Sequence, residues 1–292
     1  FGTIEPRILS FGNLRNIAFQ ASYLAIFAMA QTVVILTRGF DLSLGFTVSL
    51  VSVVASMAMV SAGADAGSIA WGMAAGLGVA GAIGLANGLL IAGIGITPQV
   101  TTLGMANIVM AFASTISGGF PVTGLPPQLT QIFAQATVLG LPVPILVAAI
   151  VFVLLALMLK ATRFGRSLYI LGANPRAATA AGIRTVPVLV LAYTLCGLLA
   201  AVGALLLTAR TGSGEPNLGG NLTLEAIAAA VVGGVKLSGG EGGVVAALLG
   251  ALFITVLSNS MNLVQIDGYL QQVCLGIIII VSLIVSRADF RR

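Results

Sequence analysis

Long apolar segments separated by short polar breaks run through almost the whole chain. A helix needs about 20 mostly apolar residues to cross the hydrocarbon core of a bilayer. Nine segments approach this requirement, at roughly residues 17–37, 42–60, 68–93, 98–117, 142–160, 186–208, 222–235, 242–264 and 268–286. The pattern therefore predicts an all-α integral membrane protein, a polytopic helical bundle with about nine spans in this chain.

Two parts of the pattern depart from simple spanning helices. The segment at 222–235 is short and contains Glu225, which predicts a tilted, broken or partly re-entrant element covered by protein. The proline-containing stretch at 118–141 predicts an external segment that holds a short helix at the surface. A docking contact, an external gate and a plain connecting loop all remain open for this stretch.

Charged residues are distributed very unevenly along the chain. Residues 42–159 contain one, Asp65, whereas residues 160–184 supply five cations and no acid. Short basic loops tend to stay in the cytoplasm. The loop at 161–185 is therefore predicted to be cytoplasmic, and successive crossings place the C-terminus, with Arg291 and Arg292, on the same side.

Counting back through five crossings places residues 1–16 outside. An inner-membrane protein of this kind is expected to start in the cytoplasm, and the first residue here is Phe1 rather than Met. We therefore expect one further helix upstream and ten spans in the full-length protein. Residues 1–292 are predicted to form a single transmembrane domain.

Composition supports the membrane assignment and argues against several kinds of site. Hydrophobic residues make up 58% of the chain and charged residues 7%, against about 25% charged residues in soluble domains. The net charge of +5 comes from flanking loops, so it does not indicate nucleic-acid binding. Histidine is absent, and Cys196 and Cys274 are isolated in apolar stretches, which indicates packing rather than a metal site, a disulfide or a catalytic group.

Small residues recur on one predicted helix. Gly72, Gly76, Gly84 and Gly88 are spaced at multiples of four residues within a single span. Small faces of this kind let two helix backbones approach each other closely. We expect ordinary helix packing at these glycines.

A short helix is predicted inside the cytoplasmic loop. Asn174 suits the N-cap, Pro175 the first turn, and Gly182 the position after the last turn. Its body from 177 to 181 consists almost entirely of alanine, which leaves little side chain to hold its own fold. We therefore expect it to lie in the groove of another protein.

This loop resembles the coupling helix of permease subunits of ATP-binding-cassette (ABC) importers. Those subunits carry Glu-Ala-Ala-x-x-x-Gly, and this chain has Arg176 at the position of the glutamate. The resemblance implies a set of residues that couple the subunit to an ATPase: Arg166, Gly172, Asn174, Pro175, Arg176, Ala177, Ala178 and Gly182.

A second resemblance narrows the family. Residues 39–45 read Gly-Phe-Asp-Leu-Ser-Leu-Gly, similar to the Gly-Ile-Asp-Leu-Ser-Val-Gly element of ribose-type sugar permeases. The same family commonly has an acid followed by Ala-Ile-Ala-Ala and then a Gly-Gly turn, as at residues 225–229 and 233–240. These matches run in order over nearly the whole chain, from about residue 31 to residue 286.

Asp41 has two possible roles. With Ser43 it can cap the helix that follows, because a carboxylate meets the free N–H groups at a helix N-terminus. Alternatively it pairs with Arg38 or forms a gate contact that changes between transport states, because ionisable residues near membrane depth are often functional.

One motif points to a different subunit. Residues 237–241 read Leu-Ser-Gly-Gly-Glu, the signature of the ATPase subunit of ABC transporters. The chain has no Gly-x-x-x-x-Gly-Lys-Ser/Thr phosphate loop, and the five residues lie between predicted spans. We interpret them as a tight turn.

Polar residues inside or beside the spans are candidates for the substrate path or its gate. A neutral sugar needs hydroxyl and amide partners rather than fixed charges. Bonding between helices is the alternative for each residue. The candidates are Asp41, Ser43, Asn87, Gln99, Thr101, Thr102, Asn107, Asn259 and Asn262.

The resemblance implies a non-catalytic permease subunit that moves a monosaccharide, such as ribose, xylose, arabinose or galactose, across the bacterial inner membrane. It implies a second permease subunit, identical or homologous, a cytoplasmic ABC ATPase and a periplasmic or extracellular substrate-binding protein, with no nucleic-acid partner. This chain would bind no cofactor, and ATP and Mg²⁺ would be used by the ATPase.

Three other functions remain as alternatives. A permease for nucleosides or branched-chain amino acids shares parts of the coupling pattern. An ion-coupled secondary transporter commonly relies on acids or histidines within the membrane, and the central spans have few. A membrane-embedded enzyme would need a catalytic constellation that the sequence does not suggest.

Overall fold

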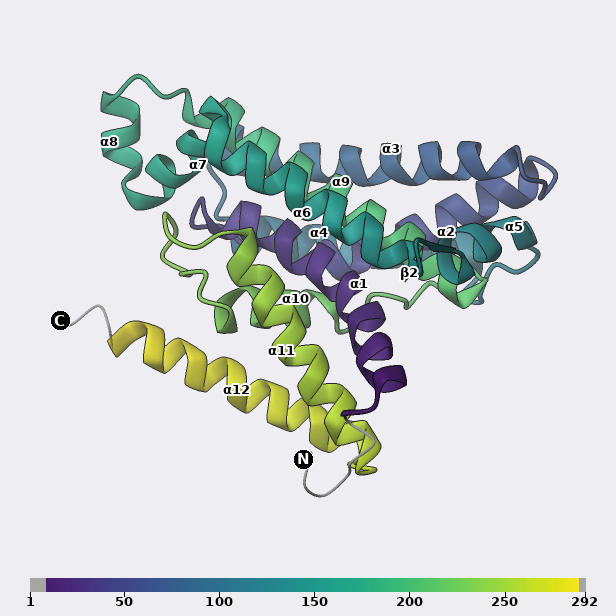
Figure 1. Cartoon of the computed structure of the whole chain (residues 1–292). Coiled ribbons are helices and arrows are strands. Elements are labelled where there is room, and N and C mark those ends of the chain that lie inside the picture. The colour runs from purple at the N-terminus through teal and green to yellow at the C-terminus, as the bar shows by residue number, and fades with distance from the viewer. Residues whose placement is uncertain (1–8, 289–292) are drawn as a thin grey trace.

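The computed structural model describes residues 9–288, which form a bundle of long helices (Figure 1). The described residues include neither residues 1–8, at the N-terminus, nor Arg291 and Arg292, at the basic C-terminal end. The long helices are α1 (Phe11–Ile35), α2 (Leu44–Ser61), α3 (Ser68–Leu89), α4 (Pro98–Ser117), α6 (Val143–Ala161), α9 (Thr185–Thr211), α11 (Val244–Leu263) and α12 (Gly268–Ala288).

Shorter elements connect these helices. The π-helical turn η2 (Leu90–Ile94) extends α3. The stretch at 118–141 contains α5 (Pro127–Thr130), η3 (Gln131–Gln135) and a small antiparallel pair, β1 (Thr137–Val138) and β2 (Leu141–Pro142). The short helix predicted at 118–141 is therefore confirmed. The remaining short helices are α7 (Arg163–Ala173), α8 (Pro175–Ala180) and α10 (Leu222–Val232).

Every predicted apolar segment corresponds to a helix. Seven helices in the described part of the chain are long and apolar enough to cross a membrane, which confirms a polytopic all-α architecture. The apolar helical stretches Leu222–Val232 and Gly268–Ile278 are shorter. The total of about nine crossings stays a prediction.

Helix α1 occupies the centre of the bundle. It packs against α6, α9, α10 and α11, and its side chains from Ala25 to Ala30 are fully buried. A helix that is apolar on all sides is expected to be buried in this way. By contrast, α3, α4 and α6 expose large apolar side chains such as Trp71, Phe112 and Leu154, which suit contact with lipid.

The glycines of α3 permit close helix contacts, as predicted. A Cβ atom at Gly72 would meet Met59 and the backbone of α2, and one at Gly84 would meet the carbonyl oxygen of Tyr193 in α9. Helix α3 therefore lies against α2 through one half of its glycine face and against α9 through the other. Only residues without a side chain allow this approach.

The loop at 161–185 holds one helix more than the sequence pattern predicted. Helix α7 precedes α8, and its buried residues Gly165, Leu168, Leu171 and Gly172 lie on one face. This amphipathic spacing anchors α7 on the bundle, while α8 projects at the end of the molecule (Figure 1).

Candidate functional site

Helix α8 has the capped geometry that its sequence predicts. The Asn174 side chain accepts hydrogen bonds from the backbone N–H groups of Arg176 and Ala177, at 3.0 and 3.1 Å. Pro175 opens the helix, and Gly182 follows it with a φ of +77°. A six-residue helix is thus held by its two ends rather than by its side chains.

Burial divides the residues of this helix into two groups. Arg176, Ala177 and Ala180 are exposed, whereas the Ala178 side chain is fully buried within the chain. This corrects the prediction that Ala178 itself offers a contact to a partner, because its Cβ is already covered. The exposed alanines present the flat surface that another protein can meet.

Arg38 connects the α1–α2 turn to the helix before α8. Its guanidinium donates from Nε to the carbonyl oxygen of Gly172 and from Nη2 to that of Ala173, the latter at 2.5 Å. These carbonyls belong to the last turn of α7 and have no partner in that helix. Among the described residues Arg38 forms no ion pair with Asp41, so that predicted pairing is wrong.

A third chain segment completes the junction that Arg38 forms between the α1–α2 turn and α7. The Gly240 N–H donates to the carbonyl oxygen of Leu36, at 3.0 Å, and the Tyr169 hydroxyl donates to that of Gly242, also at 3.0 Å. Burial raises the pKa of Tyr169, so the hydroxyl keeps its proton at neutral pH. The α1–α2 turn, the end of α7 and the turn before α11 therefore form one connected unit.

The turn before α11 has the compact form expected for residues 237–241. Lys236 forms an ion pair with Glu241 at 2.5 Å, and its N–H donates to the Glu241 carbonyl oxygen at 3.1 Å. Gly239 and Gly240 have φ values of +77° and +76°, which favour glycine. The Leu-Ser-Gly-Gly-Glu run is thus used as a turn, as predicted.

Asp41 belongs to a buried hydrogen-bond network at the start of α2. Its carboxylate accepts from the N–H and the hydroxyl of Ser43, at 2.9 and 2.5 Å. Asn87 of α3 donates to the Ser43 hydroxyl at 3.0 Å, and Gln31 of α1 donates to the Asp41 carbonyl oxygen at 2.6 Å. The network ties three helices together. Because the Asp41 carboxylate bonds to Ser43, which precedes the first residue of α2, rather than to N–H groups of the helix itself, the capping role stays a prediction.

The other path candidates do not gather at one place. Thr102 lies beside the Asp41 network, because its hydroxyl is within hydrogen-bond distance of the carbonyl oxygens of Phe40 and Pro98, at 3.4 and 2.9 Å. Asn259 accepts from Asn13 at 2.9 Å near the opposite end of α1. Asn107 donates to Leu103 within its own helix, and Asn262 accepts from Gln271. Thr101 is buried and Gln99 is exposed.

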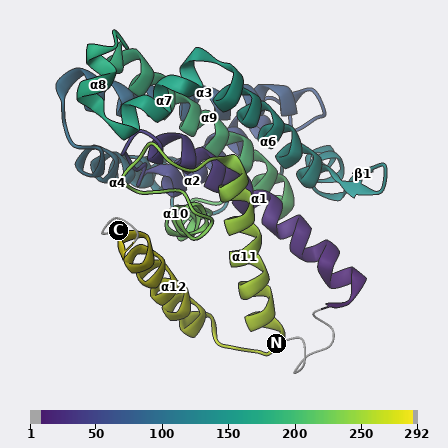
Figure 2. The same cartoon turned by 60° about the vertical axis from the view of Figure 1, so that its left-hand side comes forward.

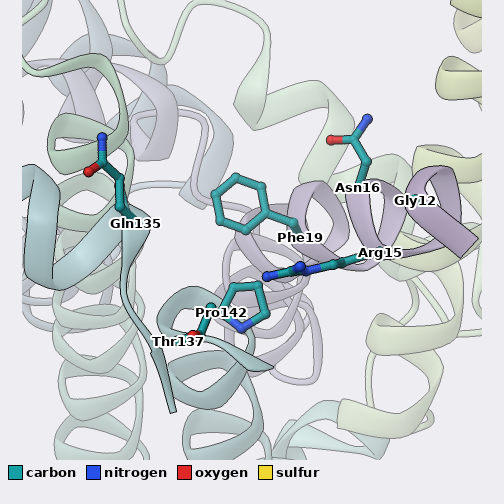
Figure 3. Close-up of a pocket in the computed structure, with 8 residues that line it drawn as sticks. Gly12, Arg15, Asn16, Phe19, Gln135, Thr137 and Pro142 are labelled. Carbon is teal, nitrogen blue, oxygen red and sulfur yellow. The ribbon is translucent and has the colours of Figure 1, made fainter. Parts of the chain in front are cut away.

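A pocket opens at the other end of the bundle from α8. It has a volume of about 270 Å³ and lies between the start of α1 and the segment from η3 to β2. The Arg15 side chain extends across the pocket towards Pro142, and the Phe19 ring lies on the side of Arg15 away from Pro142 (Figure 3). Its walls also include polar groups of Asn16, Gln135 and Thr137.

Comparison with known families identifies this arrangement. Residues 13–283 match the family described as the branched-chain amino acid transport system / permease component, and this range includes all the helices above except the ends of α1 and α12. The chain belongs to this permease family.

Several curated relatives of the permease are sugar importers by name. It is 36% identical to the ribose import permease protein RbsC of Bacillus subtilis over 285 residues, which cover 97% of this chain and 87% of the relative. It is 35% identical to RbsC of Escherichia coli K12, over 97% and 88%, and 33% identical to the D-allose transport system permease protein AlsC of the same strain, over 98% and 87%. No solved structure matches the chain. The predicted resemblance to ribose-type permeases is confirmed.

Several residues that build the permease's sites escaped the sequence analysis. Gln31 is fully buried beside Asp41, and Ser49, Ser52 and Thr223 bond to chain segments far away in sequence. The signal for Gln31 was an amide side chain with apolar stretches of the span on both sides. For the serines it was their helical spacing on one face of α2.

Proposed function

We propose that this chain is the membrane-spanning permease subunit of an ATP-driven importer for a monosaccharide of the ribose, allose or galactose type. The relatives named for ribose and allose transport cover nearly the whole chain, so the proposal rests on the entire domain rather than on one motif. This chain binds no cofactor, and a separate ATPase uses ATP and Mg²⁺. We place the protein in the bacterial inner membrane with its C-terminus in the cytoplasm.

The observation that carries the proposal is the cytoplasmic junction. The exposed face of α8 is joined through the last turn of α7 and Arg38 to the turn between α1 and α2. An ATPase that moves α8 therefore acts on α1, the central helix of the bundle. Two permease subunits, identical or homologous, would then tilt between outward-open and inward-open states as the ATPases close and reopen.

Delivery of substrate takes place at the opposite end. A soluble substrate-binding protein docks over the external segment 118–141 and the pocket beside Arg15, where polar groups face outwards. This arrangement separates substrate delivery from ATP hydrolysis across the membrane. It also removes any need for a catalytic group in the permease itself.

The test is uptake by membrane vesicles that hold the permease with its ATPase and binding protein. We expect ATP-dependent uptake of a labelled monosaccharide, no uptake of leucine, and no uptake when the ATPase is left out. Dissipating the proton and sodium gradients should have no effect. Uptake driven by an ion gradient in vesicles with the permease alone would overturn the proposal in favour of a secondary transporter.

A further inference from the structure

The chain between α9 and α10 enters the bundle without forming a helix. Residues 212–221 are irregular and lie along α2, whose facing residues Gly45, Ser49, Ser52 and Ser56 share one side of the helix. These four positions span eleven residues, or about 17 Å of α2 at 1.5 Å per residue. The segment thus runs through much of the depth of the membrane, which partly explains why α10 is short.

One face of this segment is bound tightly to α2. The Glu215 and Gly219 N–H groups donate to the hydroxyls of Ser52 and Ser49, at 3.1 and 3.0 Å. The Gly45 N–H donates to the Thr223 hydroxyl at 2.8 Å. A Cβ atom at Gly219 would collide with the backbone of Gly45, so at this point the two backbones approach each other as closely as only glycine permits.

The other face of the segment is polar and uncovered. Asn217, Gly220 and Asn221 are exposed, although their neighbours Gly219 and Thr223 are buried against α2. In the part of the chain that the structure describes, neither asparagine side chain forms a hydrogen bond. The N–H groups of Asn217, Gly220 and Asn221 likewise donate to no described group.

Such a face is incompatible with lipid. A backbone or amide group without a hydrogen-bond partner costs several kcal/mol in hydrocarbon, so irregular backbone at membrane depth occurs only where protein covers it or water reaches it. Lipid-facing positions elsewhere in this chain are apolar, as at Leu154 of α6. The polar face of residues 217–221 therefore needs either water or a covering protein, and within the described chain no protein covers Asn217, Gly220 or Asn221.

From this geometry we propose that residues 217–221 line the water-filled substrate path, and that the amides of Asn217 and Asn221 bind the hydroxyl groups of a neutral sugar. Each amide offers two donors and an acceptor, which matches a polyhydroxyl ligand without fixed charge. The serine stripe of α2 holds the segment rigid, so the two asparagines are presented on a fixed scaffold. The substrate assignment rests on the proposed function, whereas the access of water does not.

Cysteine labelling tests the access of water directly. In a Cys274→Ser background, Asn217→Cys should react with a charged, water-soluble thiol reagent in at least one of the nucleotide-free and ATP-trapped states. Leu154→Cys, on the lipid face of α6, is the matched control and should not react. If Asn217→Cys fails to insert, Asn221→Cys takes its place.

The outcomes separate the alternatives. A cysteine that stays unlabelled in both states, or that instead forms disulfide-linked permease dimers in high yield, would show that protein covers the face and would overturn the proposal. Labelling that persists in a transporter that carries no sugar would support the path and refute the proposed function.

Substitution tests the contact with sugar. Asn217→Leu and Asn221→Leu should each raise the KM for sugar uptake by about three- to tenfold, the effect of one neutral hydrogen bond, with insertion and ATPase association unchanged. An unchanged KM in the double variant would overturn the binding role of these amides.

Discussion

Arg38 is the residue on which coupling is expected to depend most. It is an exposed arginine with a φ of +69°, a backbone conformation that glycine adopts more easily. Its planar guanidinium group donates to two carbonyl oxygens of α7 at the same time. Lysine is a point donor and cannot match this geometry.

We therefore predict that Arg38→Lys uncouples the transporter. Uptake should fall by about tenfold, while ATP hydrolysis by the assembled complex continues, because one charge-assisted hydrogen bond is worth about 1.5–3 kcal/mol. Arg38→Gly is the control for the backbone, since it relieves the positive φ and removes both bonds. Uptake by Arg38→Gly at the level of the unchanged protein would show that the Arg38 side chain does not transmit movement from α8 to α1.

Two variants of Asp41 distinguish a structural role of its side chain from a role that requires its negative charge. Asparagine can accept both hydrogen bonds from Ser43, so Asp41→Asn should keep the unfolding midpoint and most of the uptake. Asp41→Ala leaves the Ser43 N–H buried without a partner and should cost about 1–3 kcal/mol in unfolding free energy. Thermal unfolding in detergent and vesicle uptake measure the two effects. Loss of uptake in both variants, with normal stability, would instead indicate a gate that needs the charge.

The elements of this protein were largely predictable, because local composition decides whether a segment is apolar enough to form a membrane helix. All nine apolar segments are helices, and the cap of α8 follows from Asn174, Pro175 and Gly182. The course of residues 212–221 was not predictable, since it depends on serines of α2 more than 150 residues away in sequence. The burial of Ala178 was not predicted either, because residue spacing alone does not determine which face of a six-residue helix turns towards the bundle.

The glycine face of α3 gives a paired prediction at the scale of helix packing. Gly84→Ala places a methyl group against the Tyr193 carbonyl oxygen and should destabilise the protein by about 1–3 kcal/mol. Gly78→Ala, on the same helix with open space around it, should leave the unfolding midpoint unchanged or slightly raised. Equal effects at the two positions would contradict the close contact between α3 and α9.

Helix α8 is the element expected to meet the ATPase. Ala177→Glu adds bulk and charge to its exposed face and should abolish copurification of the ATPase while the permease still inserts. Ala66→Glu makes the same change at an exposed position between α2 and α3, at the other end of the bundle, and should leave the complex intact. Dissociation caused by both variants would point to a general defect rather than to a docking site.

At the scale of the whole molecule, the two ends of the bundle are built differently. One end holds α7, α8 and the basic residues between α6 and α9, and the other holds the small strands and the pocket beside Arg15 (Figures 1 and 2). Such polarity suits a transporter that receives force on one side and substrate on the other. Because α1 contacts α6, α9, α10 and α11, a movement of its end beside Arg38 is expected to reach these four helices.

This polarity requires one orientation in the membrane. The positive-inside rule places the cations between α6 and α9 in the cytoplasm, and α8 lies among them. In a Cys274→Ser background, with Cys196 fully buried, an impermeant maleimide added to intact cells should label Ala66→Cys. Ala180→Cys should react only after the cells are permeabilised. The reverse pattern would place α8 outside, beyond the reach of any cytoplasmic ATPase, and the coupling mechanism would fail with it.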